Sequence, residues 1–140
     1  MAVNTQFSIA VHILAALAYR CGDRDITSGQ LAKSVNTSPS FVRRVLARLS
    51  KAGLVETTTG KSGACVLARD PQNVSLLEIY RAVGAPKAFA IHSYSEQKIC
   101  TVSCHIKTAL EKALAKTQSA MEAGLAEISL KQIIADVKKA

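Results

Sequence analysis

The start and stop signals of two consecutive helices constrain this fold more than any other feature of the sequence. Thr27 and Gln30 have the spacing of a capping box, in which each side chain pairs with a free backbone amide at a helix start. Ser38 is a favoured N-cap residue, and Pro39 fits the first helical position, where no backbone N–H is needed. Gly53 is a typical C-terminal stop. The segment therefore predicts a short helix, a turn and a longer helix.

Further elements are expected on both sides of this pair. Apolar residues recur at steps of three and four over residues 4–20, which predicts an amphipathic first helix. Two short β-prone runs, 54–58 and 64–67, flank a glycine-bracketed segment that is typical of a hairpin. A capping box that starts at Ser75 predicts a fourth helix, which stops at Gly84.

The C-terminal third predicts a loop, a long helix and a short one. Residues 85–103 show no clear periodicity. From about Cys104 to Ala126 the apolar residues keep helical spacing, and a third capping box at Ser129 predicts a last short helix.

This order of elements is that of a winged helix-turn-helix, in which the second helix of the pair enters the DNA major groove and the hairpin is the wing. The predicted fold class is mainly α, with a small β-hairpin wing and a long C-terminal dimerisation helix. The winged domain is expected over residues 1–84, a loop with a candidate sensor role over 85–103, and the dimerisation helix with the terminal helix over 104–140. We expect all three to pack as one compact unit.

The charge distribution predicts double-stranded DNA as a partner. The formal net charge is +8, and residues 1–69 carry +6 of it. The longer helix of the pair has basic and hydroxyl side chains on one side and no acid, whereas solvated helix faces usually mix both signs. The candidate DNA contacts on this helix and the wing are Ser38, Ser40, Arg43, Arg44, Arg48, Lys51, Thr59, Gly60 and Lys61.

These candidates divide into two roles. Ser40 and Arg43, near the helix start, are expected to read base edges, so their loss should relax the choice of base pair. Arg48 is expected to contact phosphate, so Arg48→Ala should weaken binding to every sequence. A merely solvated helix face is the alternative explanation.

The long helix carries an apolar stripe that a domain of this size has little else to cover. The stripe is expected to be core or a dimer seam. The candidate interface residues are Ile106, Leu110, Ala113, Leu114, Met121 and Leu125.

The four cysteines are not expected to form a secreted disulfide framework, because the chain has no convincing export signal and no membrane span, and it is interpreted as cytoplasmic. Cys100 and Cys104 would lie one turn apart at a helix start, where the positive helix end and Lys98 favour thiolates. A redox response through them is one hypothesis, with pairing to Cys21 or Cys65 as a variant; inert packed thiols are the other.

The sequence resembles the Rrf-two family of bacterial winged-helix transcriptional regulators, which includes an iron–sulfur cluster regulator, a nitric-oxide-sensitive repressor and a cysteine-metabolism repressor. The likeness covers nearly the whole chain and is most specific over residues 26–54, 59–83 and 128–134. It implies a dimer joined by the long helix, with two recognition helices that read a palindromic operator.

The departures from this family concern its cofactor. Members with a cluster usually carry three cysteines before the long helix and a further ligand, whereas this chain has Cys100 and Cys104 only, and Gln6 where a relative places an acid. A [2Fe–2S] cluster generally takes four ligands. His92 and His105 could add two nitrogens, but no spacing rule supports them. No cofactor is firmly predicted and no metal site is assigned, and an iron–sulfur cluster or zinc at Cys100 and Cys104 stays an open alternative.

The sequence predicts a dimeric DNA-binding transcriptional regulator, a repressor of a palindromic operator, with thiol-based redox control as a further hypothesis. The alternative is a redox or metal sensor that acts through protein partners and uses the winged helix as a scaffold. No enzyme is expected, because no Ser-His-Asp order, phosphate loop, HExxH motif or paired carboxylates are present. The effector is not identified by the sequence.

Overall fold

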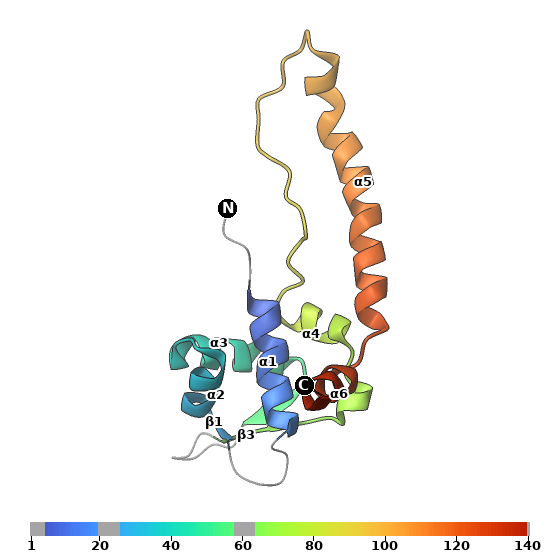
Figure 1. Ribbon diagram of the computed structural model, residues 1–140. Coiled ribbons are helices and arrows are strands. Elements are labelled where there is room, and N and C mark those ends of the chain that lie inside the picture. The colour runs from blue at the N-terminus through green and yellow to red at the C-terminus, as the bar shows by residue number, and fades with distance from the viewer. Residues whose placement is uncertain (1–4, 20–25, 58–63, 140) are drawn as a thin grey trace. The chain divides into compact units, whose positions relative to one another are not determined.

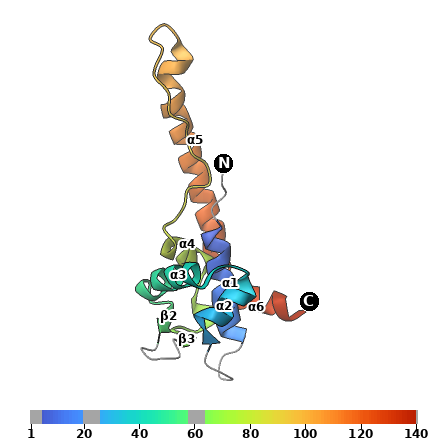
Figure 2. The same cartoon turned by 90° about the vertical axis from the view of Figure 1, so that its left-hand side faces the viewer.

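The computed structural model describes residues 5–19, 26–57 and 64–139. They form helices and a small antiparallel sheet (Figures 1 and 2). In chain order the elements are α1 (Gln6–Tyr19), β1 (Ile26–Thr27), α2 (Ser28–Val35), α3 (Pro39–Lys51), β2 (Val55–Thr57), β3 (Ala64–Leu67), a 3-10 turn η1 (Pro71–Asn73), α4 (Leu76–Ala82), α5 (Thr101–Ala126) and α6 (Leu130–Lys139). The predicted mainly helical winged fold is confirmed.

Helix α1 is the centre of the core. It contacts α2, α3, α4, α6 and β3 (Figure 1). Ala10, Ile13 and Leu14 on its inner face have no exposed surface. Burial of each larger apolar side chain contributes about 1.5–3 kcal/mol, so this face supplies much of the driving force for folding.

The helix-turn-helix forms as the local signals predict. Thr27 accepts a hydrogen bond from the backbone of Gln30, whose side chain pairs back with Thr27 N, so the capping box is complete. Ser38 caps α3 and Pro39 opens it. Gly53 follows the end of α3 with a φ of 78°, a left-handed conformation that glycine adopts without strain.

The sheet has one strand more than the sequence predicts. Its order is β1-β3-β2, with both pairs antiparallel. The added strand pairs Ile26 with Cys65 and Thr27 with Ala64. A two-residue strand carries no periodic pattern and is defined only by its partner, which explains why the sequence did not reveal it.

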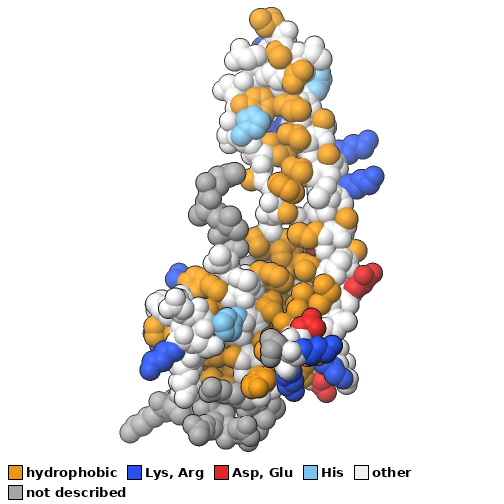
Figure 3. Space-filling view, viewed as in Figure 1, with side chains coloured by type: hydrophobic (Ala, Val, Ile, Leu, Met, Phe, Trp, Pro, Cys, Tyr) orange, Lys and Arg blue, Asp and Glu red, His pale blue; other side chains and the backbone are white. Residues whose placement is uncertain are grey.

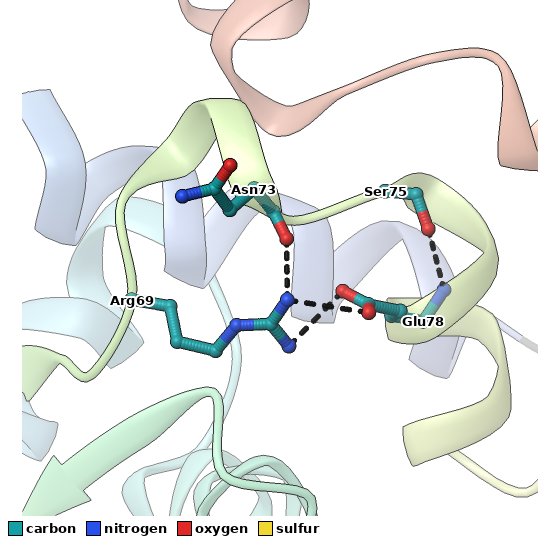
Figure 4. Close-up of polar contacts among 4 residues, drawn as sticks. All are labelled: Arg69, Asn73, Ser75 and Glu78. Atoms are coloured by element: carbon teal, nitrogen blue, oxygen red, sulfur yellow. Dashed lines mark hydrogen bonds and ion pairs between the residues drawn. The ribbon is translucent and has the colours of Figure 1, made fainter.

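The second capping box is present only in half. Ser75 Oγ accepts from the backbone of Glu78 at 3.2 Å, but the Glu78 carboxylate pairs with Arg69, with Nη1–Oε2 and Nη2–Oε1 distances of 3.2 and 3.3 Å (Figure 4). Arg69 also donates to the backbone carbonyl of Asn73. The Glu78 carboxylate therefore pairs with the Arg69 guanidinium and not, as the capping box predicts, with the free backbone N–H at the helix start.

Helix α6 joins the N-terminal part of the chain. Its capping box between Ser129 and Gln132 is complete. The starts of α4 and α6 form a backbone bridge, in which Leu76 N donates to Ile128 O at 2.9 Å and Leu130 N to Val74 O at 2.8 Å.

The chain consists of two compact units. The first unit is Met1–Pro86 with Leu125–Ala140, and the second is Lys87–Gly124. Helix α6 therefore groups with the winged part of the chain. Helix α5 begins at Thr101, three residues before its predicted start. None of the helices in the described ranges is long and apolar enough to cross a membrane.

The complete capping box of α2 leads to a stability prediction. Thr27→Ala removes the side-chain acceptor for Gln30 N and should lower the free energy of unfolding by about 1 kcal/mol. Thr27→Ser keeps the hydroxyl and should therefore retain most of this stabilisation. Urea unfolding at one fixed protein concentration measures both. Equal midpoints for the two variants would contradict a stabilising role of the box.

Candidate nucleic-acid interface

Helix α3 is fixed by its ends and by its inner face. Ser38 Oγ accepts from Phe41 N at 3.2 Å, which satisfies one free amide of the first turn. Val42, Val45 and Leu49 on the inner face are at most 1% exposed. These contacts leave the opposite side of the helix facing solvent.

The exposed side of α3 forms one wall of a recess of about 590 Å³. Successive helical residues are about 100° apart, so Arg43, Ala47 and Ser50 lie within about 60° of one another on this wall. The other walls come from the start of α2 and from the sheet. The recess is lined by Ser28, Arg43, Leu46, Ala47, Ser50, Lys51, Thr57 and Cys65.

This recess has the chemistry of an anion site. Two predicted DNA contacts, Arg43 and Lys51, are brought together there with the hydroxyls of Ser28, Ser50 and Thr57. Cations and hydroxyls are the side chains that bind phosphate oxygens of DNA. The sequence pattern did not indicate these three hydroxyls. Ser50 could have been found from the sequence, because it lies seven residues after Arg43 on the same helix. Ser28 and Thr57 are brought to the recess only by the fold.

The remaining candidates at the start of α3 are exposed. The Ser38 and Ser40 hydroxyls lie 3.3 Å apart. The Arg44 guanidinium lies 5.2 Å from the centre of the Phe41 ring, an arrangement that holds the cation at the protein surface. Neither arrangement prevents contact with DNA.

Arg48 differs from the other cations of α3. Its Nη1 donates to Val83 O at 2.9 Å and to Gln6 Oε1 at 3.0 Å. The acceptors belong to the end of α4 and the first residue of α1, so the guanidinium is engaged within the protein. The predicted wing residues Thr59, Gly60 and Lys61 lie outside the described residues.

The cysteines occupy different environments. Cys65 is buried in the central strand β3, and desolvation raises the pKa of its thiol, which disfavours the reactive thiolate. Cys100 is exposed and directly precedes α5. Cys104 lies in the first turn of that helix and is half-buried. Cys21 lies outside the described residues.

Cys100 caps helix α5. Its Sγ accepts from Ser103 N at 3.4 Å, and its carbonyl oxygen accepts from Cys104 N at 3.1 Å. The thiol of Cys104 points to the carbonyl of Gln97, with an S–O distance of 3.5 Å. Ser103 ties the preceding loop to this turn, because its oxygens accept from Tyr94 Oη and Gln97 N, both at 2.8 Å. The two cysteines therefore belong to a local hydrogen-bonded structure at the helix start.

Helix α5 has 26 residues, and none of them is buried. The space-filling view shows apolar side chains along its length (Figure 3). Among the predicted interface residues Ala113 is exposed, and the others, Ile106, Leu110, Leu114, Met121 and Leu125, are half-buried.

The model of one protein family, Rrf2, described as "Iron-dependent Transcriptional regulator", matches residues 3–136 of the chain. The chain belongs to the Rrf2 family. This is the Rrf-two family that the sequence resembles, so that prediction is confirmed. The chain is therefore a DNA-binding transcriptional regulator and not an enzyme.

Individual Rrf2 relatives agree with this assignment. YwnA of Bacillus subtilis is 38% identical over 133 residues, which are 94% of this chain and 96% of YwnA. The HTH-type transcriptional regulator NsrR of B. subtilis is 29% identical over 112 residues, which are 79% of this chain and 75% of NsrR. The structure of T. potens IscR has the same fold, with a TM-score of 0.71 at 22% identity and coverage of 98% of this chain and 88% of IscR.

The iron dependence in the description of the Rrf2 family is not matched by the side chains that the structure describes. Cys100 and Cys104 supply two thiols, both already engaged by backbone groups. Within residues 5–19, 26–57 and 64–139, no group of three or more His, Cys, Asp or Glu side chains could hold a metal ion. The described residues do not fit a four-ligand cluster, and we assign no step to iron.

Proposed function

We propose that this Rrf2-family protein is a homodimeric repressor that reads a palindromic DNA site with α3 and the wing, and that oxidation of its thiols lowers its affinity for DNA. The observation that carries the proposal is the recess between α2, α3 and the sheet, where Arg43 and Lys51 meet three hydroxyls. Lys51 and the hydroxyls fit a phosphate of the DNA backbone, and Arg43 on the same wall fits the edge of an adjacent base.

Within this interface the proposed roles differ along α3. Ser40 and Arg43 lie in its first half and read base edges, where an arginine can pair with the O6 and N7 of guanine. Arg44 and Lys51 neutralise phosphates, and Ser38, Thr59, Gly60 and Lys61 add contacts at the helix start and wing. A protein of this kind represses by covering a promoter and excluding polymerase, which needs no further activity.

The proposed dimer is supported by α5. Its 26 residues rise about 39 Å, a length over which two copies can pair apolar stripes. An apolar stripe without one buried residue is unusual in a soluble monomer, since large exposed apolar patches generally mark interaction sites. A two-fold dimer would present two α3 helices to two half-sites, which is why a palindrome is the expected operator.

The proposed thiol response is supported by the cap of α5. The exposed Sγ of Cys100 is the acceptor for Ser103 N, so oxidation of this sulfur changes the group that starts the dimerisation helix. Cys65 is a poor candidate, because burial raises the pKa of its thiol.

The DNA-binding roles predict different effects of two substitutions. Lys51→Ala should weaken binding to every duplex and make the slope of log affinity against log salt shallower by about 0.9, the change for one lost phosphate contact. Arg43→Ala should cost about 1–3 kcal/mol at particular base pairs of the selected site. Fluorescence anisotropy on genomic fragments selected by the wild type, at several salt concentrations, measures both.

The control for these substitutions is Lys131→Ala, an exposed cation on α6, which should leave the slope unchanged. If the wild type enriches no fragment and its duplex binding is insensitive to salt, the proposal fails. The function through protein partners would then be favoured.

The dimer predicts a change of mass. The wild type should have twice the 14.9 kDa mass of the chain in light scattering coupled to size exclusion. Leu114→Glu places a charge on the stripe and should produce a monomer, whose affinity for the palindrome falls on the order of 100-fold because the two half-sites no longer bind together. Lys116→Glu, an exposed position on the same helix, is the matched control. A monomeric wild type contradicts the proposed dimer.

The thiol hypothesis predicts that Cys100→Ser uncouples DNA binding from oxidation. Hydrogen peroxide, which oxidises the Cys100 thiol to a sulfenic acid and is itself reduced to water, should lower the affinity of the wild type at least about tenfold. Cys100→Ser keeps an oxygen acceptor for Ser103 N but removes the oxidisable sulfur, and should bind equally before and after treatment. Cys65→Ala serves as the comparison and should remain sensitive. Loss of sensitivity in Cys65→Ala alone would contradict the assignment to Cys100.

A further inference from the structure

We infer that Arg48 is a positioning residue for DNA recognition, which fixes α3 to the start of α1 and to the end of α4, and is not a phosphate contact. This inference rests on the proposed DNA-binding function. It replaces the role that the sequence predicts for Arg48.

The direction of the side chain separates Arg48 from the DNA-contacting side of α3. Five residues at 100° each place Arg48 about 140° around the helix from Arg43, whereas Ala47 is only about 40° away. Arg48 is also absent from the lining of the recess that holds Arg43 and Lys51. It therefore leaves the helix on the flank that meets other elements.

The contacts on this flank are directional. Arg48 as a whole is exposed, but its Nη1 donates to Val83 O at 2.9 Å and to Gln6 Oε1 at 3.0 Å. Val83 is the C-cap of α4, and a cation on the last carbonyls of a helix is stabilised by the negative end of the helix dipole. A Cβ added to Gly84 would lie 3.4 Å from the same Nη1, so the guanidinium sits tightly against this helix end.

The hydrogen bonds of Arg48 are directional, whereas the apolar packing of α3 is not. The inner face of α3 packs through aliphatic side chains such as Val45 and Leu49, and such contacts are non-directional. Hydrogen bonds require a narrow range of distance and angle. Two of them from one guanidinium restrict the rotation of α3 about its axis, and this rotation determines where Arg43 points. Base reading depends on that orientation, because a bidentate pair with guanine has one geometry.

The hydrogen bond from Arg48 to Val83 lies close to the point where the chain leaves the first unit. The end of α4 is held by Ala85 N, which donates to Tyr80 O at 2.9 Å, and by the Tyr80 hydroxyl, which donates to Pro86 O. The first unit ends at Pro86, and the chain continues into the segment that leads to Cys100. A change of backbone conformation at 83–86 would remove one acceptor of Arg48. The recognition helix is thus bonded to the point where the chain leaves its unit.

The test compares salt-dependent duplex affinities of the wild type and five variants. Arg48→Ala should weaken binding to the selected site at least about tenfold with an unchanged salt slope, since no phosphate contact is lost. Arg48→Lys, which keeps the charge but not the two-acceptor geometry, should not restore affinity. Gln6→Ala should weaken binding in the same direction, and the double variant Arg48→Ala/Gln6→Ala no more than Arg48→Ala alone.

Arg69→Ala provides the matched control. Arg69 also joins a backbone carbonyl and a side chain, Asn73 O and Glu78, but it donates to no residue of α3. Arg69→Ala should lower the unfolding temperature and leave the DNA affinity of the folded protein unchanged. If Arg48→Ala fails to fold, as monitored by circular dichroism, Gln6→Ala and Arg48→Lys decide the question.

The outcomes separate the inference from the function on which it rests. A slope shallower by about 0.9 in Arg48→Ala, rescue by Arg48→Lys, or wild-type affinity in Gln6→Ala would each overturn the positioning role and leave DNA binding intact. A wild type that binds no duplex would overturn the proposed function, and the inference with it.

Discussion

Burial of the apolar face of α1 is the interaction on which the rest of the first unit depends. This helix contacts four other helices and β3, and Ala10, Ile13 and Leu14 on its inner face are fully enclosed. Because the elements share one central helix, the packing that stabilises the unit also places α3 beside the sheet, and the hydrogen bonds of Arg48 restrict the rotation of α3. The recess that joins α2, α3 and the sheet is therefore a product of the core.

The two sides of helix α3 have different roles. Its apolar side anchors it to the core, and its exposed side carries the cations and hydroxyls that suit a DNA backbone. Arg48 lies between these sides and makes hydrogen bonds to Val83 and Gln6. A cation on a DNA-binding helix thus need not contact DNA: its position around the helix and its protein partners determine its role.

Helix α5 is organised by different physical constraints. None of its residues is buried, and the larger apolar side chains of its stripe are only half-buried in the single chain, which is the basis of the proposed dimer. Its first turn is stabilised by groups of Cys100 and Ser103. The thiol response that we propose for Cys100 would connect the oxidation state of this side chain to the local stability of the helix start.

The sequence by itself determined the order of the helices, the complete capping boxes of α2 and α6, the start and stop of α3 and the wing strands β2 and β3. Those features depend on residues a few positions apart, and short-range rules describe them well. Only the tertiary structure decided the strand β1, the pairing of Glu78 with Arg69, the place of α6 in the first unit and the partners of Arg48. Gln6 lies 42 residues from Arg48 in the chain. No local pattern can indicate which of several distant acceptors a long, flexible arginine side chain will reach.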